Sequence, residues 1–148
     1  MAEGTISILN KRAKFEYEFL EKYVAGIQLL GTEVKSLRTG NASITDAYCA
    51  FDDGELYLIN AHIAEFKFGN INNHEPLRKR KLLLKKRELR KLEGKLKDKG
   101  LTIVPIRIFQ SDRGFAKIDI ALAKGKKEFD KRQDIKKRDV DREIARYT

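Results

Sequence analysis

Short strand-like segments joined by tight turns constrain the fold of this 148-residue chain more than any other feature of its sequence. Residues 14–19 alternate aromatic with charged side chains, and this period of two predicts a half-buried strand with its rings on one face. Residues 24–30 predict a second strand, in which Gly26 marks a bend or a close approach of the backbone. We therefore expect the chain to begin a sheet early in its sequence.

Two pairs of apolar segments flank turn-forming residues, and each pair predicts a β-hairpin. They are 48–51 with 55–59 around Asp52-Asp53-Gly54, and 101–109 with 115–122 around Ser111-Asp112-Arg113-Gly114. Pro105 interrupts one of these segments, so we expect an edge position or a bulge there. About six short antiparallel strands predict a mainly β (α+β) fold, a closed or nearly closed barrel of the oligonucleotide-binding type with flanking helices.

Two helices are expected beside the strands. A short one covers residues 33–38, with Thr32 as its N-cap and Gly40 as its end. A long one covers residues 80–99, where Gly94 is expected to interrupt or bend it. One face of this long helix carries four leucines, and lysines and arginines occupy its other faces. The leucines are Leu82, Leu89, Leu92 and Leu96.

The net charge of +10 is concentrated in two segments. Residues 1–77 carry 7 basic and 11 acidic side chains, whereas residues 78–99 carry 12 basic and 3 acidic ones, and residues 124–148 carry 10 and 6. Repulsion at such density opposes folding unless a polyanion is the normal partner. Basic segments of this kind favour a nucleic-acid partner. Neither segment has the Trp- or Phe-rich apolar face that a helix at a membrane surface needs, so a membrane surface is not expected as a partner.

Motifs that carry catalytic chemistry are missing from the sequence. It has no phosphate-binding glycine loop, no dinucleotide-binding glycine pattern and no paired-histidine zinc motif. The lone Cys49 excludes a cysteine-built zinc site and is interpreted as a core residue. His62 is interpreted as structural, and His74 as either a solvated loop residue or a phosphate contact. We therefore expect no enzymatic activity, no cofactor and no bound metal.

The expected location is the cytoplasm. No apolar run reaches the ~20 residues that a membrane span needs. The residues at positions 1–4 do not begin a signal-peptide pattern. A single cysteine suits a reducing compartment.

Residues 124–148 differ from the rest in being dense in both charges, with scattered apolar residues. A helix here would gather four of them on one face: Phe129, Val140, Ile144 and Tyr147. That stripe is too sparse to anchor the segment firmly to a core. We predict that residues 1–123 form an RNA-binding barrel domain and residues 124–148 a basic tail, disordered when free and helical when bound on the ribosome.

Six strings of residues occur in a distinctive order and spacing. They are Asn10-Lys11-Arg12-Ala13, Ala25-Gly26-Ile27, Gly31-Thr32-Glu33-Val34-Lys35-Ser36-Leu37-Arg38, Asn73-His74-Glu75-Pro76-Leu77-Arg78-Lys79-Arg80-Lys81-Leu82-Leu83-Leu84, Ala123-Lys124-Gly125-Lys126-Lys127 and Asp130-Lys131-Arg132. Together they closely resemble the small protein B family, the bacterial proteins that bind transfer-messenger RNA (SsrA RNA). The resemblance covers residues 8–146, nearly the whole chain.

This resemblance implies a part in trans-translation. Members of the family bind the tRNA-like domain of transfer-messenger RNA and escort the alanyl-charged RNA to stalled ribosomes, where the incomplete peptide is tagged for degradation. Their fold is an oligonucleotide-binding-type barrel with flanking helices, and their basic tail enters the vacant mRNA channel along small-subunit RNA. The shared RNA also implies elongation factor Tu and alanyl-tRNA synthetase as further candidate partners.

The resemblance implies roles for individual residues as well. Asn10 and Lys117 match family positions implicated in RNA binding, and Leu83 matches another, where a leucine would support the site. Neighbouring cations complete the expected RNA-binding set: Lys11, Arg12, Lys14, Arg78, Arg80 and Lys81. Positions associated with ribosomal function are matched in the tail by Lys126, Lys127, Phe129, Asp130, Lys131 and Arg132. The Phe129 ring would stack on a ribosomal RNA base.

The chain departs from the family pattern at Val24, where many members carry an acidic residue. If that carboxylate takes part in RNA recognition, another residue must supply it here. Glu21 is the candidate that lies nearest in the sequence.

Two other classes of protein fit the charge profile. One is a ribosomal protein or general RNA chaperone with a barrel fold, which would show little preference for transfer-messenger RNA. The other is an RNA-processing enzyme, against which the missing catalytic motifs argue.

Overall fold

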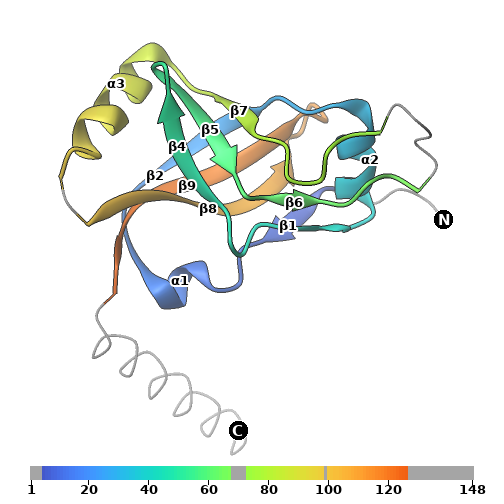
Figure 1. Cartoon of the computed structure of the whole chain (residues 1–148), viewed down its shortest axis with the longest axis horizontal. Coiled ribbons are helices and arrows are strands. Elements are labelled where there is room, and N and C mark those ends of the chain that lie inside the picture. The colour runs from blue at the N-terminus through green and yellow to red at the C-terminus, as the bar shows by residue number, and fades with distance from the viewer. Residues whose placement is uncertain (1–4, 68–72, 99, 127–148) are drawn as a thin grey trace, which may run out of the picture.

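Antiparallel strands form most of the described part of the chain, which in this computed structural model comprises residues 5–67, 73–98 and 100–126 (Figure 1). These residues also contain three helices. In chain order the elements are β1 (Ser7–Leu9), α1 (Ala13–Glu16), β2 (Tyr17–Ile27), α2 (Gly31–Arg38), β3 (Ala42–Ser43), β4 (Tyr48–Asp52), β5 (Glu55–Ile59), β6 (His62–Ile63), β7 (Arg80–Leu83), α3 (Lys86–Lys95), β8 (Leu101–Gln110) and β9 (Ala116–Gly125). The predicted mainly β architecture with flanking helices is confirmed.

Six strands of the larger sheet pair with one another in a closed ring. Their order is β8-β4-β5-β7-β2-β9, and β9 pairs back along β8. β1 pairs with β8 outside this ring, and β3 with β6 form a separate small sheet. The pairing is extensive along β9, whereas β2 meets β7 at two residue pairs, Gly26–Leu83 and Ile27–Leu82.

One continuous strand, β2, covers residues 17–19 of the first predicted strand and residues 24–27 of the second, and it ends before residues 28–30. The predicted strand is wrong for residues 14–16, which belong to the helical turn α1. Here the N–H groups of Phe15 and Glu16 both donate to the Arg12 carbonyl oxygen. The turn connects β1, which pairs with β8, to β2, which pairs with β9. A period of two in the sequence does not reveal this connection.

Both predicted hairpins are confirmed, and their turns use the expected backbone conformations. Asp53 and Gly54 have φ of 51° and 76°, the two positive values that a type I′ hairpin turn requires. Gly114 has φ of 86° in the second hairpin. The bulge predicted at Pro105 is confirmed by a register shift between Pro105 and Arg107, because proline lacks the N–H group of a regular ladder.

The long helix predicted over 80–99 is wrong in its first part, where the structure has strand β7. This strand points Arg80 and Leu82 inward, and it pairs with β5 and β2. A buried arginine disguises the period of two, because a charged residue is normally taken for an exposed one. The helix that follows, α3, ends at Lys95, one residue after Gly94 and before the predicted end at residue 99.

Helix α2 confirms the predicted short helix and ends, as predicted, before Gly40, whose φ is 78°. It begins earlier than predicted, at Gly31, so that Leu30 rather than Thr32 is its N-cap residue. The Leu30 N–H donates to Glu33 Oε1 at 2.7 Å, which is the contact that a glutamate at the third helical position makes in a capping box. Within the described residues, no helix is long and apolar enough to cross a membrane.

Apolar side chains fill the interior of the ring, and helices close its two ends (Figure 1). α2 contributes Leu37 at one end, and α3 contributes Leu89 and Leu92 at the other. Burial of each large aliphatic side chain stabilises the fold by about 1.5–3 kcal/mol. The strands supply fully buried residues that include Leu56, Leu58, Ile103, Ile118 and Ile120.

The close approach predicted at Gly26 is confirmed and makes this position sensitive to substitution. A Cβ atom there would lie 3.2 Å from the Leu83 Cβ, at the short seam between β2 and β7. We expect Gly26→Ala to lower the free energy of unfolding by about 1–3 kcal/mol through overpacking, measured by urea denaturation. Gly94→Ala is the control, because nothing lies within 4 Å of its Cβ position. It should raise the free energy of unfolding by about 0.5–1 kcal/mol. Equal changes in the free energy of unfolding for the two variants would contradict close packing between β2 and β7 at Gly26.

Candidate nucleic-acid interface

The long strands β2, β9 and β8 present one side of the sheet to solvent, and their register aligns residues from different parts of the chain. Gly26 pairs with Leu83 on β7 and with Lys117 on β9, and Lys117 pairs with Phe109 on β8. Cα partners on neighbouring strands point to the same face of a sheet. Two predicted RNA-binding residues, Leu83 and Lys117, therefore lie in one row on either side of a glycine.

A second row lies two residues further along the strands. Val24 pairs with Asp119, and Asp119 pairs with Arg107, whose Nε lies 2.6 Å from the Asp119 Oδ2. Beside this row is a cleft of about 290 Å³, lined by Lys22, Val24, Asp119 and two neighbours. The two rows and Lys22 make up what we call the outer face: Lys22, Val24, Leu83, Arg107, Phe109, Lys117 and Asp119.

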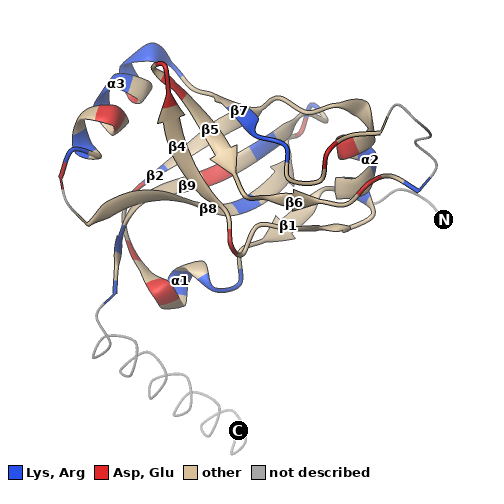
Figure 2. Cartoon of the chain, viewed as in Figure 1, with Lys and Arg blue, Asp and Glu red and all other residues tan. Residues whose placement is uncertain are grey.

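The outer face combines exposed apolar side chains with cations. Val24 and Leu83 are 58% and 46% exposed. The Arg107 guanidinium lies 4.5 Å from the centroid of the Phe109 ring. Cations on such a surface neutralise phosphates, while apolar and aromatic side chains pack against riboses or bases. Figure 2 shows lysines and arginines on these strands and a denser set along α3.

Glu21 does not supply a carboxylate to the outer face. The register shifts between Phe19 and Glu21, and the Glu21 carboxylate pairs with Lys91 and Lys95 on α3. Hydrogen bonds from Lys95 and from the Tyr23 hydroxyl lower the pKa of Glu21 to about 2. The assignment of Glu21 as a substitute for the missing carboxylate at position 24 is therefore not supported. Asp119 is the carboxylate that lies opposite Val24.

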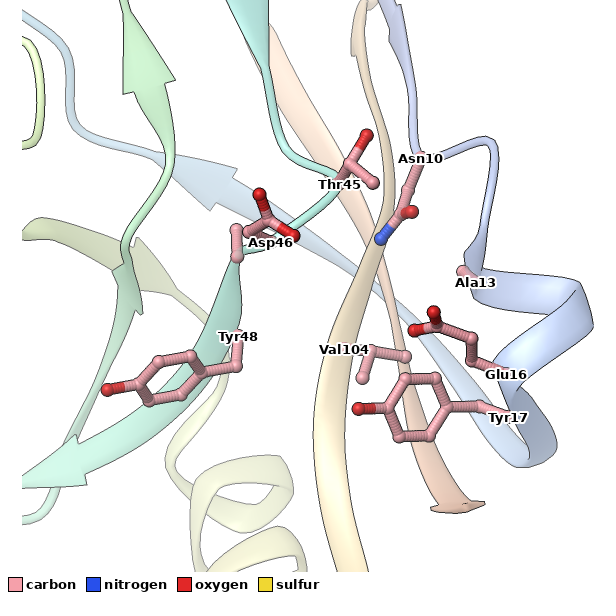
Figure 3. A pocket seen from close by; sticks show the side chains of 9 residues that line it. Asn10, Ala13, Glu16, Tyr17, Thr45, Asp46, Tyr48 and Val104 are labelled. Atoms are coloured by element: carbon pink, nitrogen blue, oxygen red, sulfur yellow. The ribbon is translucent and has the colours of Figure 1, made fainter. Parts of the chain in front are cut away.

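A second group of predicted residues surrounds α1 (Figure 3). Asn10 is used structurally, since its Nδ2 donates to the Pro105 carbonyl oxygen at 2.9 Å. The cations beside Asn10 are exposed. The Arg12 Nε lies 3.8 Å from the Glu16 Oε1. A cleft of about 210 Å³ opens between α1 and the start of β4, and Tyr17 and Tyr48 are among its lining residues. The exposed cations of this group are Lys11, Arg12 and Lys14.

The start of the predicted tail is attached to α1. β9 ends at Gly125, after which the Lys126 N–H donates to the Glu16 carbonyl oxygen at 2.9 Å. The Lys126 Nζ donates to the Lys14 carbonyl oxygen at 2.8 Å. The other predicted ribosome-contacting residues lie outside the described part of the chain. They are Lys127, Phe129, Asp130, Lys131 and Arg132.

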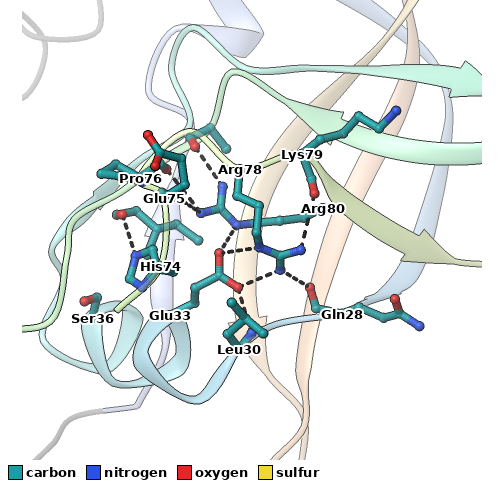
Figure 4. A network of polar contacts seen from close by, with 12 residues as sticks. Gln28, Leu30, Glu33, Ser36, His74, Glu75, Pro76, Arg78, Lys79 and Arg80 are labelled. Atoms are coloured by element: carbon teal, nitrogen blue, oxygen red, sulfur yellow. Dashed lines mark hydrogen bonds and ion pairs between the residues drawn. The ribbon is translucent and has the colours of Figure 1, made fainter. Parts of the chain in front are cut away.

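A buried carboxylate, Glu33, organises the segment that leads into β7 (Figure 4). The Arg78 Nη2 lies 2.7 Å from Glu33 Oε1, and the Arg80 Nε lies 2.5 Å from Glu33 Oε2. The side chains of Glu33 and Arg80 are 0% exposed. Arg80 also donates to the carbonyl oxygens of Ala61 and Pro76. Each of the three nitrogens of this buried guanidinium group thus has a partner.

These ion pairs bear on three of the predicted RNA-binding residues. Arg78 keeps its side chain 32% exposed, and the Lys81 Nζ lies 3.7 Å from Glu55 Oε2. Arg80 reaches RNA only if its buried pair opens, so in this structure it positions β7. Direct RNA contacts by these residues remain predictions.

His74 is a buried structural residue in this network, so its interpretation as a solvated loop residue is wrong. One ring nitrogen lies 2.8 Å from the Thr32 hydroxyl, and the other lies 2.8 Å from the Ile63 carbonyl oxygen. Because both ring nitrogens are engaged, His74 joins α2 to β6. The alternative of a phosphate contact is thereby disfavoured.

Sequence patterns did not predict that four further residues share the outer face. They are Lys22, Arg107, Phe109 and Asp119. Part of the signal was present, because counting outward from the second hairpin turn pairs Phe109 with Lys117 and Arg107 with Asp119. The pairing of β2 with β9 joins segments about a hundred residues apart, and no local pattern indicates it.

Replacing Glu33 tests the ion-pair network that it forms with Arg78 and Arg80. Burial alone would raise the pKa of Glu33, but hydrogen bonds from Arg78 and the Leu30 N–H and the charge of Arg80 outweigh it and hold the pKa below its ordinary value. We expect Glu33→Gln to lower the free energy of unfolding at pH 7 by about 3–5 kcal/mol, because Arg80 keeps a buried charge without its counterion.

The pH dependence supplies the control for this variant. A carboxyl group with a lowered folded-state pKa stabilises the fold above its unfolded pKa, and this stabilisation is lost as pH falls through the folded value. The difference between wild type and Glu33→Gln should therefore shrink below the ordinary pKa of 4.5. Urea denaturation from pH 7 to pH 3 measures it, and a difference independent of pH would contradict the ionised pair.

Comparison with known proteins identifies a family. The family model described as "SmpB protein" matches residues 7–148. The chain is 55% identical to an "SsrA-binding protein" of Flavobacterium psychrophilum, over 96% of this chain and 95% of the relative. It is 56% identical to an "SsrA-binding protein" of Phocaeicola vulgatus, over 99% of this chain and 97% of the relative.

A solved structure is similar in fold as well. This structure is described as "tmRNA-SmpB: a journey to the center of the bacterial ribosome". It matches this chain with a TM-score of 0.70 and 53% sequence identity. The similarity covers 83% of this chain and 86% of that chain. The chain therefore belongs to the SmpB protein family.

Proposed function

We propose that this protein is the cytoplasmic RNA-binding adaptor of trans-translation, and not an enzyme. It binds the tRNA-like domain of transfer-messenger RNA and brings that RNA to stalled ribosomes. Family membership over nearly the whole chain supports this proposal, as do the names of relatives that bind SsrA RNA. The observation that carries it in the structure is the outer face, where Leu83 and Lys117 lie in one row.

The fold suits such a role. A closed ring of six strands with helices at its ends is what an oligonucleotide-binding-type barrel would show, and we propose that class for it. The inner side of the ring is filled with apolar side chains, so RNA contacts are confined to its outside.

On the outer face, recognition follows the shape and backbone of folded RNA. A-form RNA presents phosphates and 2′-hydroxyls across a shallow minor groove, which side chains on the outside of the ring can contact. Lys117 and Lys22 contact phosphates, and Leu83 and Val24 pack against riboses. Asp119 orients the Arg107 guanidinium through their 2.6 Å ion pair, which suits it for a phosphate contact as well.

The basic tail serves the ribosome rather than the RNA. It orders along small-subunit RNA in the vacant mRNA channel, so that binding senses an empty channel. Elongation factor Tu and alanyl-tRNA synthetase meet the protein through the shared RNA. A ribosomal protein or general RNA chaperone is the alternative, and it predicts no preference among structured RNAs.

Lys117 tests the outer face. We expect Lys117→Gln to weaken binding to transfer-messenger RNA by about 1 kcal/mol, or about fivefold, and to reduce the salt slope by about one, because one phosphate contact is lost. Lys35→Gln removes an exposed lysine from α2 and should change neither quantity. Salt-dependent titrations against transfer-messenger RNA and ordinary tRNA measure both. Equal wild-type affinity for the two RNAs would overturn the proposed function.

The division of labour between outer face and tail has its own test. We expect Lys126→Ala/Lys127→Ala to leave affinity for transfer-messenger RNA within about twofold and to abolish peptide tagging, because the tail acts at the ribosome. A tagging assay with stalled ribosomes, run beside the RNA titration, separates the two activities. Loss of both together would refute this division.

A further inference from the structure

Helix α3 carries cations that neither the fold nor the outer face uses. Its buried side consists of Leu89 and Leu92, with the partly buried Leu96 just beyond its end. On one flank, Lys91 and Lys95 are held by Glu21 of β2. These contacts fix the helix over one end of the ring, and they account for two of its cations.

Helical periodicity places the remaining cations on the side away from Leu89 and Leu92, and Figure 2 shows that basic residues make up much of α3. Lys86 and Arg90 are four residues apart, and Arg87 and Arg90 three apart, so a helical period brings all three together with Lys91. Lys86, Arg87 and Arg90 are exposed and have no acidic partner within the described residues. The helix acids Glu88 and Glu93 fall at the two borders of this surface. Like charges at these spacings destabilise a helix, so the fold alone does not favour them.

Gly94 is a second, independent feature of the same surface. By helical periodicity it lies between Arg87, Arg90 and Lys91, at the centre of the exposed side. Nothing lies within 4 Å of the position that its Cβ would occupy, and its φ is not positive, so neither packing nor backbone geometry requires a glycine. Gly94 lies in the last turn of α3, where glycine still has a lower helix propensity than most other residues. It does allow a partner's backbone to approach the helix closely.

We propose that this α3 basic face, made of Lys86, Arg87 and Arg90 around Gly94, binds the phosphate backbone of ribosomal RNA. A polyanion relieves the repulsion among three cations that have no acidic partner within the described residues, and no side chain at Gly94 obstructs its approach. α3 covers an end of the ring, whereas the outer face lies on the side of strands β2, β9 and β8 (Figure 1). This inference rests on the proposed function, in which the outer face holds transfer-messenger RNA and leaves α3 for the second RNA.

The test compares two double variants of equal charge change in the full-length protein. Lys86→Gln/Arg90→Gln removes one lysine and one arginine from the α3 basic face. Lys35→Gln/Arg113→Gln removes the same pair from α2 and the second hairpin turn, both exposed. Each is titrated against mRNA-free ribosomes and against transfer-messenger RNA over a range of salt.

We expect Lys86→Gln/Arg90→Gln to weaken ribosome binding about tenfold and to reduce the salt slope by about two, with transfer-messenger RNA affinity within twofold of wild type. The control pair should change neither. An equal loss of affinity for ribosomes and for transfer-messenger RNA would overturn this inference. So would an unchanged affinity for ribosomes. The proposed function is judged separately, by whether the wild-type protein prefers transfer-messenger RNA to tRNA.

Gly94→Gln separates binding from folding. Glutamine favours a helix over glycine, so this variant should raise the melting temperature. Its side chain also fills the open centre of the α3 basic face, so ribosome affinity should fall about tenfold while transfer-messenger RNA affinity stays unchanged. Higher stability with unchanged ribosome affinity would show that nothing approaches α3 at this point.

Discussion

The buried ion pair of Glu33 with Arg80 is the interaction on which the rest of the structure depends. A charge removed from water costs several kcal/mol, so each partner is tolerable in the interior only because of the other and of further hydrogen bonds. The pair ties α2 to β7, and β7 is the strand that joins β5 to β2 in the ring. Leu83 reaches the outer face only because Arg80, three residues earlier, is held inside.

Sequence patterns predicted those elements whose cause is local. The two hairpins follow from turn residues that tolerate positive φ, and α2 ends where Gly40 permits it. The failures share a different cause. β7 escaped detection because its buried arginine has its counterion 47 residues away, and α1 escaped because it connects two strands whose own partners lie far along the chain. A local pattern contains no information about such partners.

The candidate site shows the same division. Leu83 and Lys117 were found by resemblance to a family, and the physical reason for their association is the register through Gly26, which local periodicity cannot supply. Arg78 and Arg80 were assigned to RNA because they belong to a dense basic run, whereas Glu33 pairs with both and Arg80 is buried. The predicted ribosome contacts of the tail beyond Lys126 rest on the sequence alone, because those residues lie outside the described part of the chain.

The pairing of β2 with β9 has a consequence for how the protein is made. These strands join residues 17–26 to residues 117–125, so the ring stays open until β9 has left the ribosome that synthesises the chain. Contacts between such distant segments form late in folding, because a long loop must close first. The outer face does not exist before that moment, since all three of its long strands are needed. Under the proposed function, a nascent chain therefore lacks its RNA-binding face until β9 has been synthesised.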